Sequence, residues 1–110
     1  MRFIYYTTAS GECPLLKYLR NKSQDFTRSF HKKIRQIQDH PELMSCKHLR
    51  DGIYELRIWP LGQVCRPLYA AIAEGDYLIL HMIDHLDGKA EFRAIETALE
   101  RLDEWNLRNP

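Results

Sequence analysis

The 110-residue sequence lacks the long apolar segments that mark membrane proteins and secreted precursors. Its longest apolar runs, such as residues 67–73, are much shorter than the roughly 18 residues of a membrane-spanning helix. Residues 1–6 include one basic side chain and no long apolar stretch, which is not typical of a signal peptide. We therefore expect a cytoplasmic protein with no membrane association.

Cysteine is also scarce, and its spacing excludes two kinds of stabilising framework. The chain contains Cys13, Cys46 and Cys65, with no CxxC pair. An odd number of isolated cysteines gives neither a disulfide framework nor a zinc signature. Free thiols suit a reducing compartment, and we expect all three to be ordinary small side chains.

The familiar motifs of several enzyme classes are missing. There is no glycine-rich phosphate loop, no HExxH and no motif of a serine or cysteine nucleophile. Metal ligands are commonly of the residue types found at His81, Asp84 and His85. Their spacing would bring them together on a helix, but this segment is typical of a strand followed by a loop. Because the sequence has no second group of such ligands, we expect neither a metal nor another cofactor.

Charge is nearly balanced over the whole chain but unevenly distributed along it. The net charge is +1, with a balance of +4 in residues 1–83 and of −3 in residues 84–110. A polyanion would therefore favour the first three quarters of the chain. The segment 26–38 contains no acidic residue. Four basic residues are expected on its outward face: Arg28, Lys32, Lys33 and Arg35.

Two amphipathic helices and one shorter helix are predicted. The composition, 45% hydrophobic and 28% charged, is typical of one small globular domain, which we place at residues 1–110. Pro14 opens a short helix over residues 14–20, and Ser23 is the expected N-cap of a helix that ends near His40. Its apolar stripe is Phe26, Phe30, Ile34 and Ile37. Helical spacing returns from about Lys89 to the C-terminus.

The extended segments predict a small antiparallel sheet. They are residues 2–7, 53–59, 64–73 and 77–83, the last three joined by short turns. Pro67 cannot donate to a strand ladder, which predicts an edge position or a bulge. The predicted class is α+β: a two-layer fold with two N-terminal helices and one C-terminal helix on one face of the sheet, the other face being free.

Arg57 and Arg66 lie on neighbouring predicted strands, where arginine is unusual. A guanidinium inside a strand must reach solvent, pair with an acid or contact a ligand. Its planar fork stays charged and makes two parallel hydrogen bonds to phosphate. If both side chains project from the free face, they form a cationic patch that suits phosphate. The alternative is that either arginine pairs with Glu55 or another acid.

His81 and His85 lie at the end of the last predicted strand and in the loop after it. Cleavage of RNA by its own 2′-hydroxyl needs a base on that hydroxyl, a cation at the phosphorane and an acid at the departing 5′-oxygen. Imidazole titrates near neutral pH and suits the proton transfers, while the arginines suit the stabilisation. The alternative is that both are ordinary hydrogen-bonded histidines. His31, His40 and His48 have no evident partners and are expected on the surface.

Tyr54 and Tyr69 lie on the same predicted strands as the arginines. Their aromatic faces can stack on an unpaired RNA base. The alternative is packing in the core, which we favour for at least one of them.

These residues together resemble the RelE/ParE toxin superfamily, and most closely its HigB-like, phage-derived branch. The resemblance rests on L-x-x-G-x-Y-E-L-R at residues 49–57, R-x-L-Y at residues 66–69, and a strand that ends in Ile79-Leu80-His81 before a terminal helix. It covers nearly the whole chain and is strongest from about Lys47 to Arg101.

The resemblance implies a RelE-like fold and the toxin of a type II toxin–antitoxin system. Such toxins cleave mRNA without a metal, usually on the ribosome. A small cognate antitoxin, in this branch often a helix-turn-helix protein, inhibits them. Arg57 and Arg66 match the basic strand positions of family active sites, and His81 matches the histidine that often ends the last strand in this branch. With His85, these are the predicted catalytic residues. The predicted RNA-binding residues are Lys89, Tyr54, Tyr69, Lys47 and Arg50.

The segment after His81 departs from the pattern of the branch, which commonly has F-x-K-K-x-x-x-x-P there. Residues 82–89 lack the paired lysines and include two aspartates. Either His85 and Lys89 replace the lysines, or the activity is weak or altered. Two further hypotheses follow: a ParE-like toxin that inhibits DNA gyrase without catalysis, and a phage-derived domain that only binds a partner.

Overall fold

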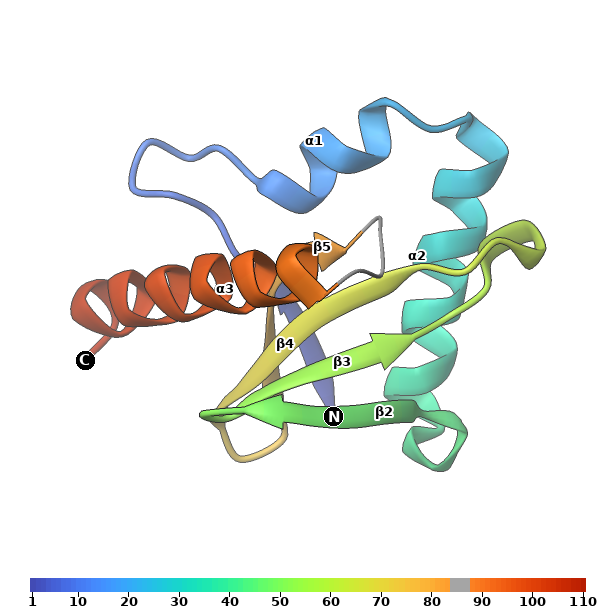
Figure 1. Ribbon diagram of the computed structural model, residues 1–110. Helices are drawn as coiled ribbons and strands as arrows, with labels where there is room; N and C mark the ends of the chain where they lie inside the picture. Colours follow the sequence, from blue (N-terminus) through green and yellow to red (C-terminus); the bar gives the residue numbers. More distant parts are fainter. Residues whose placement is uncertain (84–87) are drawn as a thin grey trace.

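The computed structural model describes residues 1–83 and 88–110, and these residues form a five-stranded sheet with three α-helices (Figure 1). None of the described helices is long and apolar enough to cross a membrane. In chain order the elements are β1 (Arg2–Tyr5), α1 (Pro14–Arg20), α2 (Gln24–Asp39), η1 (Pro41–Leu43), β2 (Ser45–Arg50), β3 (Ile53–Arg57), η2 (Pro60–Gly62), β4 (Arg66–Ala73), β5 (Asp76–Ile83) and α3 (Gly88–Arg108), where η marks a short 3₁₀ turn.

The strands lie in the order β1-β5-β4-β3-β2. All neighbours are antiparallel except β1, which pairs in parallel with β5. The α+β class is confirmed, and the predicted helix over residues 14–20 is α1. The sequence did not predict β2, because its first four residues are exposed and show no apolar alternation. As an edge strand, β2 is held by its ladder to β3 and not by buried side chains.

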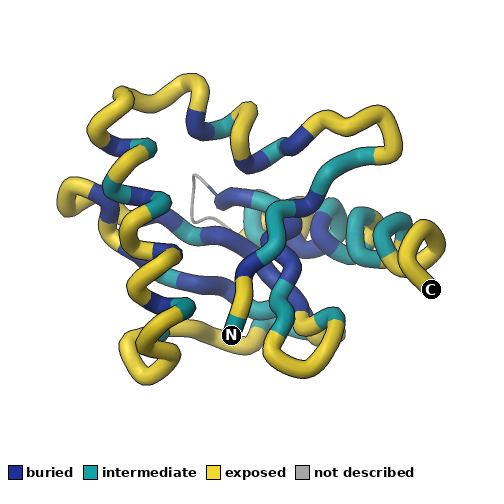
Figure 2. Tube along the Cα trace, turned by 180° about the vertical axis from the view of Figure 1, so that it is seen from behind, coloured by how far each residue is buried: buried dark blue, intermediate teal, exposed yellow. Residues whose placement is uncertain are grey.

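Helices cover both faces of the sheet, so the expectation of one free face was wrong. Phe30, Leu56 and Tyr69 belong to a core between the sheet and the pair α1 and α2. Leu68 and Ala98 belong to a second core, between the sheet and α3. Figure 2 shows the buried segments concentrated along the central strands, with exposed turns around them. The consecutive buried residues 78–80 are the sequence signal of a strand covered on both sides.

Helix α2 begins and packs as its sequence predicts. The Oγ atom of Ser23 accepts a hydrogen bond from the backbone N–H of Phe26 at 3.1 Å, which confirms the N-cap. All four residues of the predicted stripe are buried, while the cationic positions between them face outward. The helix therefore offers a basic surface on the side that faces away from the sheet.

Pro67 lies in the central strand β4, so the expectation of an edge position was wrong and that of a bulge was correct. The ladder between β4 and β5 shifts register between Leu68 and Tyr69. The ladder to β3 covers Glu55 opposite Leu68 and then stops, apart from a bridge between Ile58 and Cys65. Proline has no N–H to donate, which accounts for the gap in the ladder beside it.

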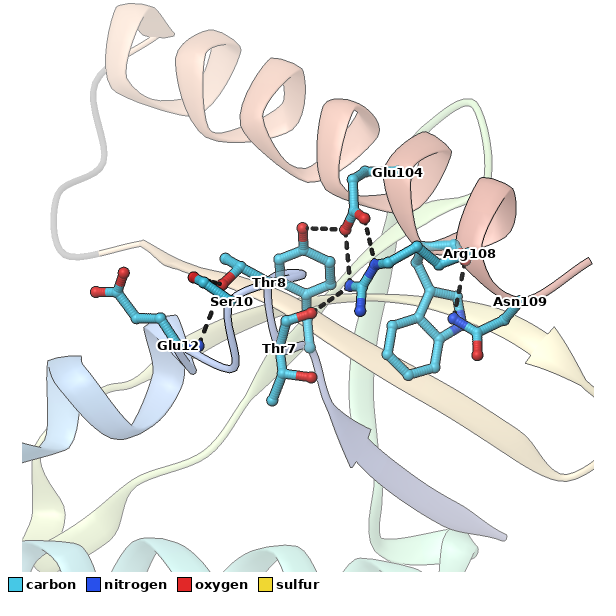
Figure 3. A network of polar contacts seen from close by, with 9 residues as sticks. Thr7, Thr8, Ser10, Glu12, Glu104, Arg108 and Asn109 are labelled. Atoms are coloured by element: carbon cyan, nitrogen blue, oxygen red, sulfur yellow. Dashed lines mark hydrogen bonds and ion pairs between the residues drawn. The ribbon is translucent and has the colours of Figure 1, made fainter.

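The C-terminal part of α3 is fastened to the segment after β1 by polar contacts (Figure 3). Tyr6 donates from its hydroxyl to the Oε1 atom of Glu104 at 2.6 Å. Arg108 donates to the same carboxylate at 2.7 Å and also to the backbone carbonyl of Thr7. These bonds join two segments that are far apart in the sequence and help to hold α3 on the sheet.

We expect Glu104→Gln to lower the free energy of unfolding at neutral pH. Hydrogen bonds from Arg108 and then Tyr6 hold the pKa of Glu104 below its ordinary value. A carboxyl with a depressed folded-state pKa stabilises the fold above its unfolded-state pKa, and this contribution is lost as the pH falls through the folded-state value. Urea unfolding of both proteins at pH 7 and about pH 3 should show the difference shrinking in acid. Glu100→Gln on the same helix is the control, and an equal difference at both pH values would contradict the prediction.

Candidate functional site

Arg57 and Arg66 meet at one buried carboxylate, that of Glu55. Arg57 donates from Nε to Oε1 of Glu55 at 2.7 Å, and the Nε atom of Arg66 lies 3.4 Å from the same oxygen. The side chain of Glu55 is 2% exposed, against 39% for Arg57 and 17% for Arg66. Both arginines therefore pair with Glu55, and they also lie together as a possible phosphate site requires.

Strand alternation explains why these three side chains share one face. Glu55 is opposite Leu68, and Leu68 packs in the core against α3. Residues two apart on a strand point to the same side, which puts Arg57 and Arg66 on the α3 side as well. The cluster lies at the C-terminal end of β3 and the N-terminal end of β4, beyond the first turn of α3 (Figure 1).

The cluster has an excess of positive charge. One carboxylate balances one of two guanidinium groups, which stay protonated at any physiological pH. The Nε atom of Arg66 is buried and lacks a hydrogen-bond partner among the described residues, since its contact with Glu55 has ion-pair distance but not hydrogen-bond geometry. A partly desolvated cation of this kind favours a bound anion.

Two further cations lie at the border of this face. Lys47 on β2 is directly opposite Glu55 and is exposed. Lys89 is exposed in the first turn of α3. Arg50 is used differently: it pairs with Asp51 and Glu96 and lies 5.5 Å from the centre of the Phe92 ring. Arg50 thus connects β2 to α3 through its contacts with Glu96 and Phe92.

Tyr54 and Tyr69 stack on each other on the opposite face, with ring centres 5.6 Å apart. Tyr69 is 2% exposed and lies in the core beneath α2, and burial raises the pKa of its hydroxyl. Tyr54 is half-buried and also contacts the ring of His48. The structure does not bring these tyrosines to the arginine cluster.

His81 lies near the end of β5, in a different setting from the arginines. The Nη1 atom of Arg101 on α3 is 3.0 Å from Nδ1 of His81 and donates to the carbonyl of Leu80 at 2.7 Å. His81 and Arg101 line a cleft of about 470 Å³ whose other wall is formed by α1 and the segment before it. Burial lowers the pKa of Arg101 below its ordinary value.

The contact with Arg101 fixes how a neutral His81 ring holds its proton. A guanidinium can only donate hydrogen bonds, so Nδ1 of His81 must accept. The proton of the neutral imidazole is then on Nε2. Arg101 was missed in the sequence, although its spacing from Ala94 and Ala98 places it at the border of the buried stripe of α3.

The remaining histidines have partners that the sequence did not predict. The Nδ1 atom of His31 lies 3.0 Å from the hydroxyl of Tyr5, whose pKa burial raises to about 12. His40 pairs with Glu42 at 3.2 Å, and His48 packs on Tyr54. The expected surface position is confirmed for His40 and His48, which are exposed, whereas His31 is only partly exposed. His85 lies outside the described residues.

Of the three side chains with metal-ligand chemistry in the sequence, His81, Asp84 and His85, the last two lie outside the described residues. Within residues 1–83 and 88–110, no group of three or more His, Cys, Asp or Glu side chains is placed to hold a metal ion. Cys13 and Cys65 are buried and Cys46 is exposed, all as free thiols.

Comparison with known proteins gives one clear match. The model of the family described as "Phage derived protein Gp49-like (DUF891)" matches residues 17–103. That range includes α2, the whole cluster of Glu55, Arg57 and Arg66, and the contact between His81 and Arg101. No curated protein matches the chain.

We expect Glu55→Gln to lower the free energy of unfolding by about 3 kcal/mol, since it leaves two partly buried guanidinium groups without their shared carboxylate. Urea unfolding measures the change. Glu42→Gln is the matched control, because Glu42 is in an exposed pair with His40 and should cost about 0.5 kcal/mol or less. Equal effects of the two substitutions would show that the cluster does not depend on the Glu55 charge.

We also expect His81 of the wild-type protein to be a single tautomer, with its proton on Nε2. Nitrogen-15 NMR at a pH where imidazole is neutral measures this. Replacing Arg101 by methionine removes the donor at Nδ1, so both tautomers should then be populated. Arg93→Met, on the exposed side of α3, should leave the His81 signals unchanged. A mixture of tautomers in the wild-type protein would contradict the assignment.

Proposed function

Because the chain belongs to the Gp49-like family of phage-derived proteins, a RelE/HigB-like toxin family, we propose that it is the toxin of a type II toxin–antitoxin system and cleaves mRNA without a metal. The observation that carries the proposal is the Glu55, Arg57 and Arg66 cluster, which holds two guanidinium groups around one carboxylate. The cluster retains positive charge at a partly exposed position, as phosphate binding requires.

The reaction is transesterification by the RNA itself. The 2′-oxygen loses its proton and bonds to the adjacent phosphorus, and the bond from phosphorus to the 5′-oxygen breaks. That oxygen takes up a proton, which leaves a 2′,3′-cyclic phosphate and a 5′-hydroxyl end. Arg57 and Arg66 stabilise the charge on the five-coordinate phosphorus, and Glu55 holds Arg57 in place by a direct hydrogen bond.

The proton transfers are assigned from the contacts of His81. With Nδ1 accepting from Arg101, the neutral ring has an N–H at Nε2, which suits hydrogen bonding to the phosphate or to the departing oxygen. The same geometry does not suit removal of the 2′-hydroxyl proton. His85 stays a prediction for that role.

The RNA-binding residues proposed from the sequence divide into two groups. Lys47 and Lys89 are exposed cations at the border of the arginine face and suit phosphates next to the scissile one. Arg50 is paired with Glu96, and Tyr69 is buried. We therefore expect these two residues to contribute less to RNA binding than the lysines. Tyr54 can assist only from the opposite face.

The partners follow from the family. A toxin of this kind has a cognate antitoxin, and we expect a small helix-turn-helix protein encoded beside it. The substrate is expected to be ribosome-bound mRNA in the cytoplasm.

A non-enzymatic toxin that inhibits DNA gyrase is the second candidate. It is favoured by the loss of the paired lysines after His81 and by the pairing of both arginines with Glu55, which can serve the fold alone. On induction, the first hypothesis predicts early arrest of translation, whereas the second predicts DNA damage and filamentous cells.

Purified protein added to translating ribosomes should truncate mRNA, read by mapping of the new 5′ ends. Arg57→Gln should lower the cleavage rate about a hundredfold, the usual cost of removing one donor to a charged transition state. Arg57 is tested because it is the more exposed arginine, and its unfolding curve checks that the fold persists. Arg2→Gln is the control, because Arg2 pairs with Asp76 at the start of β5, at the other end of that strand from His81. Absence of cleavage by the wild-type protein at every concentration tested would refute the proposal.

A further inference from the structure

A groove of about 200 Å³ lies between α2 and the connection from β3 to β4, and the proposed chemistry does not use it. It is lined by Lys33, Gln36, Ile37, Leu43, Ile58 and Trp59. The Trp59 side chain is 50% exposed, which is unusual for tryptophan, and Leu61 and Val64 on the same connection are also exposed. The groove therefore has an aromatic wall on one side and a basic helix on the other.

The helix side of the groove carries one lysine, Lys33, and α2 has two further exposed cations outside the groove lining, Lys32 and Arg35. None of the three has an ion-pair partner among the residues that the structure describes. The nearest acid on η1, Glu42, is already paired with His40 at 3.2 Å. The unpaired charge favours an anionic ligand over a neutral or basic one, and the exposed Trp59 ring beside it suits the bases of a nucleic acid.

A short stretch of chain joins the groove to the arginine cluster. Trp59 follows Arg57 by two residues, about 7 Å along an extended backbone. The connection that carries Trp59 then crosses α2 and returns to Arg66 (Figure 1), and Leu61 donates from its backbone to Ser29 of α2 at 3.3 Å. A strand bound at Arg57 and Arg66 that follows this connection meets Trp59 and then Lys33.

We propose that this groove binds single-stranded RNA, with one base stacked on Trp59 and the flanking phosphates on Lys33 and Lys32. Stacking on an exposed aromatic ring beside a cationic track is how proteins bind unpaired nucleic acid without reading its sequence. The inference rests on the proposed function, since it names where the substrate strand continues beyond the scissile phosphate.

Fluorescence of Trp59 tests the proposal directly. The chain has two tryptophans, so Trp105→Phe leaves Trp59 as the single one. The titrant is a short single-stranded oligonucleotide of 2′-O-methyl RNA, which cannot be cleaved because its nucleophile is blocked. Saturable quenching of the Trp59 emission is expected. Unchanged emission while the oligonucleotide binds would overturn the proposal.

The fluorescence anisotropy of a labelled oligonucleotide measures its affinity for each variant. Substitutions at Trp59 and at Lys33 then distinguish the contribution of base stacking from that of the phosphate contact. Trp59→Leu should weaken binding about tenfold and Trp59→Phe much less, because a phenyl ring still stacks. Lys33→Gln should weaken binding and lower the slope of log affinity against log salt by about 1. Arg2→Gln on β1, which also removes one exposed positive charge, is the matched control. Equal binding by Lys33→Gln and the wild-type protein would contradict the phosphate contact.

The outcomes also separate this inference from the proposed function. Cleavage by the wild-type protein without any response of Trp59 overturns the groove proposal alone. A response of Trp59 to the oligonucleotide without mRNA cleavage overturns the proposed function and leaves RNA docking in place. If Trp59 responds to a protein partner and not to RNA, the groove is a protein-binding site and the proposal is wrong.

Discussion

The burial of the Glu55 carboxylate constrains the centre of this protein more than any other polar contact. Among the described residues, Glu55 is the one charged side chain that is buried. A buried carboxylate is tolerated only with compensating positive charge, which Arg57 and Arg66 supply from the same and the neighbouring strand. The pairing holds two guanidinium groups on the α3 side of the sheet. They lie where the ladder between β3 and β4 is interrupted beside Pro67.

Three separate polar arrangements then surround the sheet. The arginine cluster lies on the α3 side, the contact between His81 and Arg101 lies in the cleft beside α1, and Trp59 lies in the groove beside α2. Arg66 and His81 lie on the neighbouring strands β4 and β5, so the proposed function draws on side chains from several elements and not on one of these arrangements alone.

The sequence predicted local structure well wherever the apolar spacing was strong. The N-cap at Ser23, the buried stripe of α2 and the bulge at Pro67 each follow from residue chemistry that acts within a few positions. The position of α3 on the opposite face could not be derived in this way, because both sides of a strand such as β5 are apolar. Strand alternation alone puts Glu55 and Arg57 on one face, whereas the face of Arg66 follows from the register between β3 and β4. The contact between Arg101 and His81 joins residues 20 positions apart on different elements, and only the packing of α3 creates it.

The parallel pairing of β1 with β5 has a consequence for the order in which the chain assembles. Residues 2–5 pair with residues 76–79, so the first strand has no sheet partner until most of the chain has been made. Pairings of such high sequence separation form slowly, because a long loop must close before they gain contacts. A fragment that ends before β5 carries β1 without its neighbour and cannot complete the sheet that supports Arg66. For a protein of a toxin family, this topology delays completion of the sheet that carries the arginine cluster until β5 has been made.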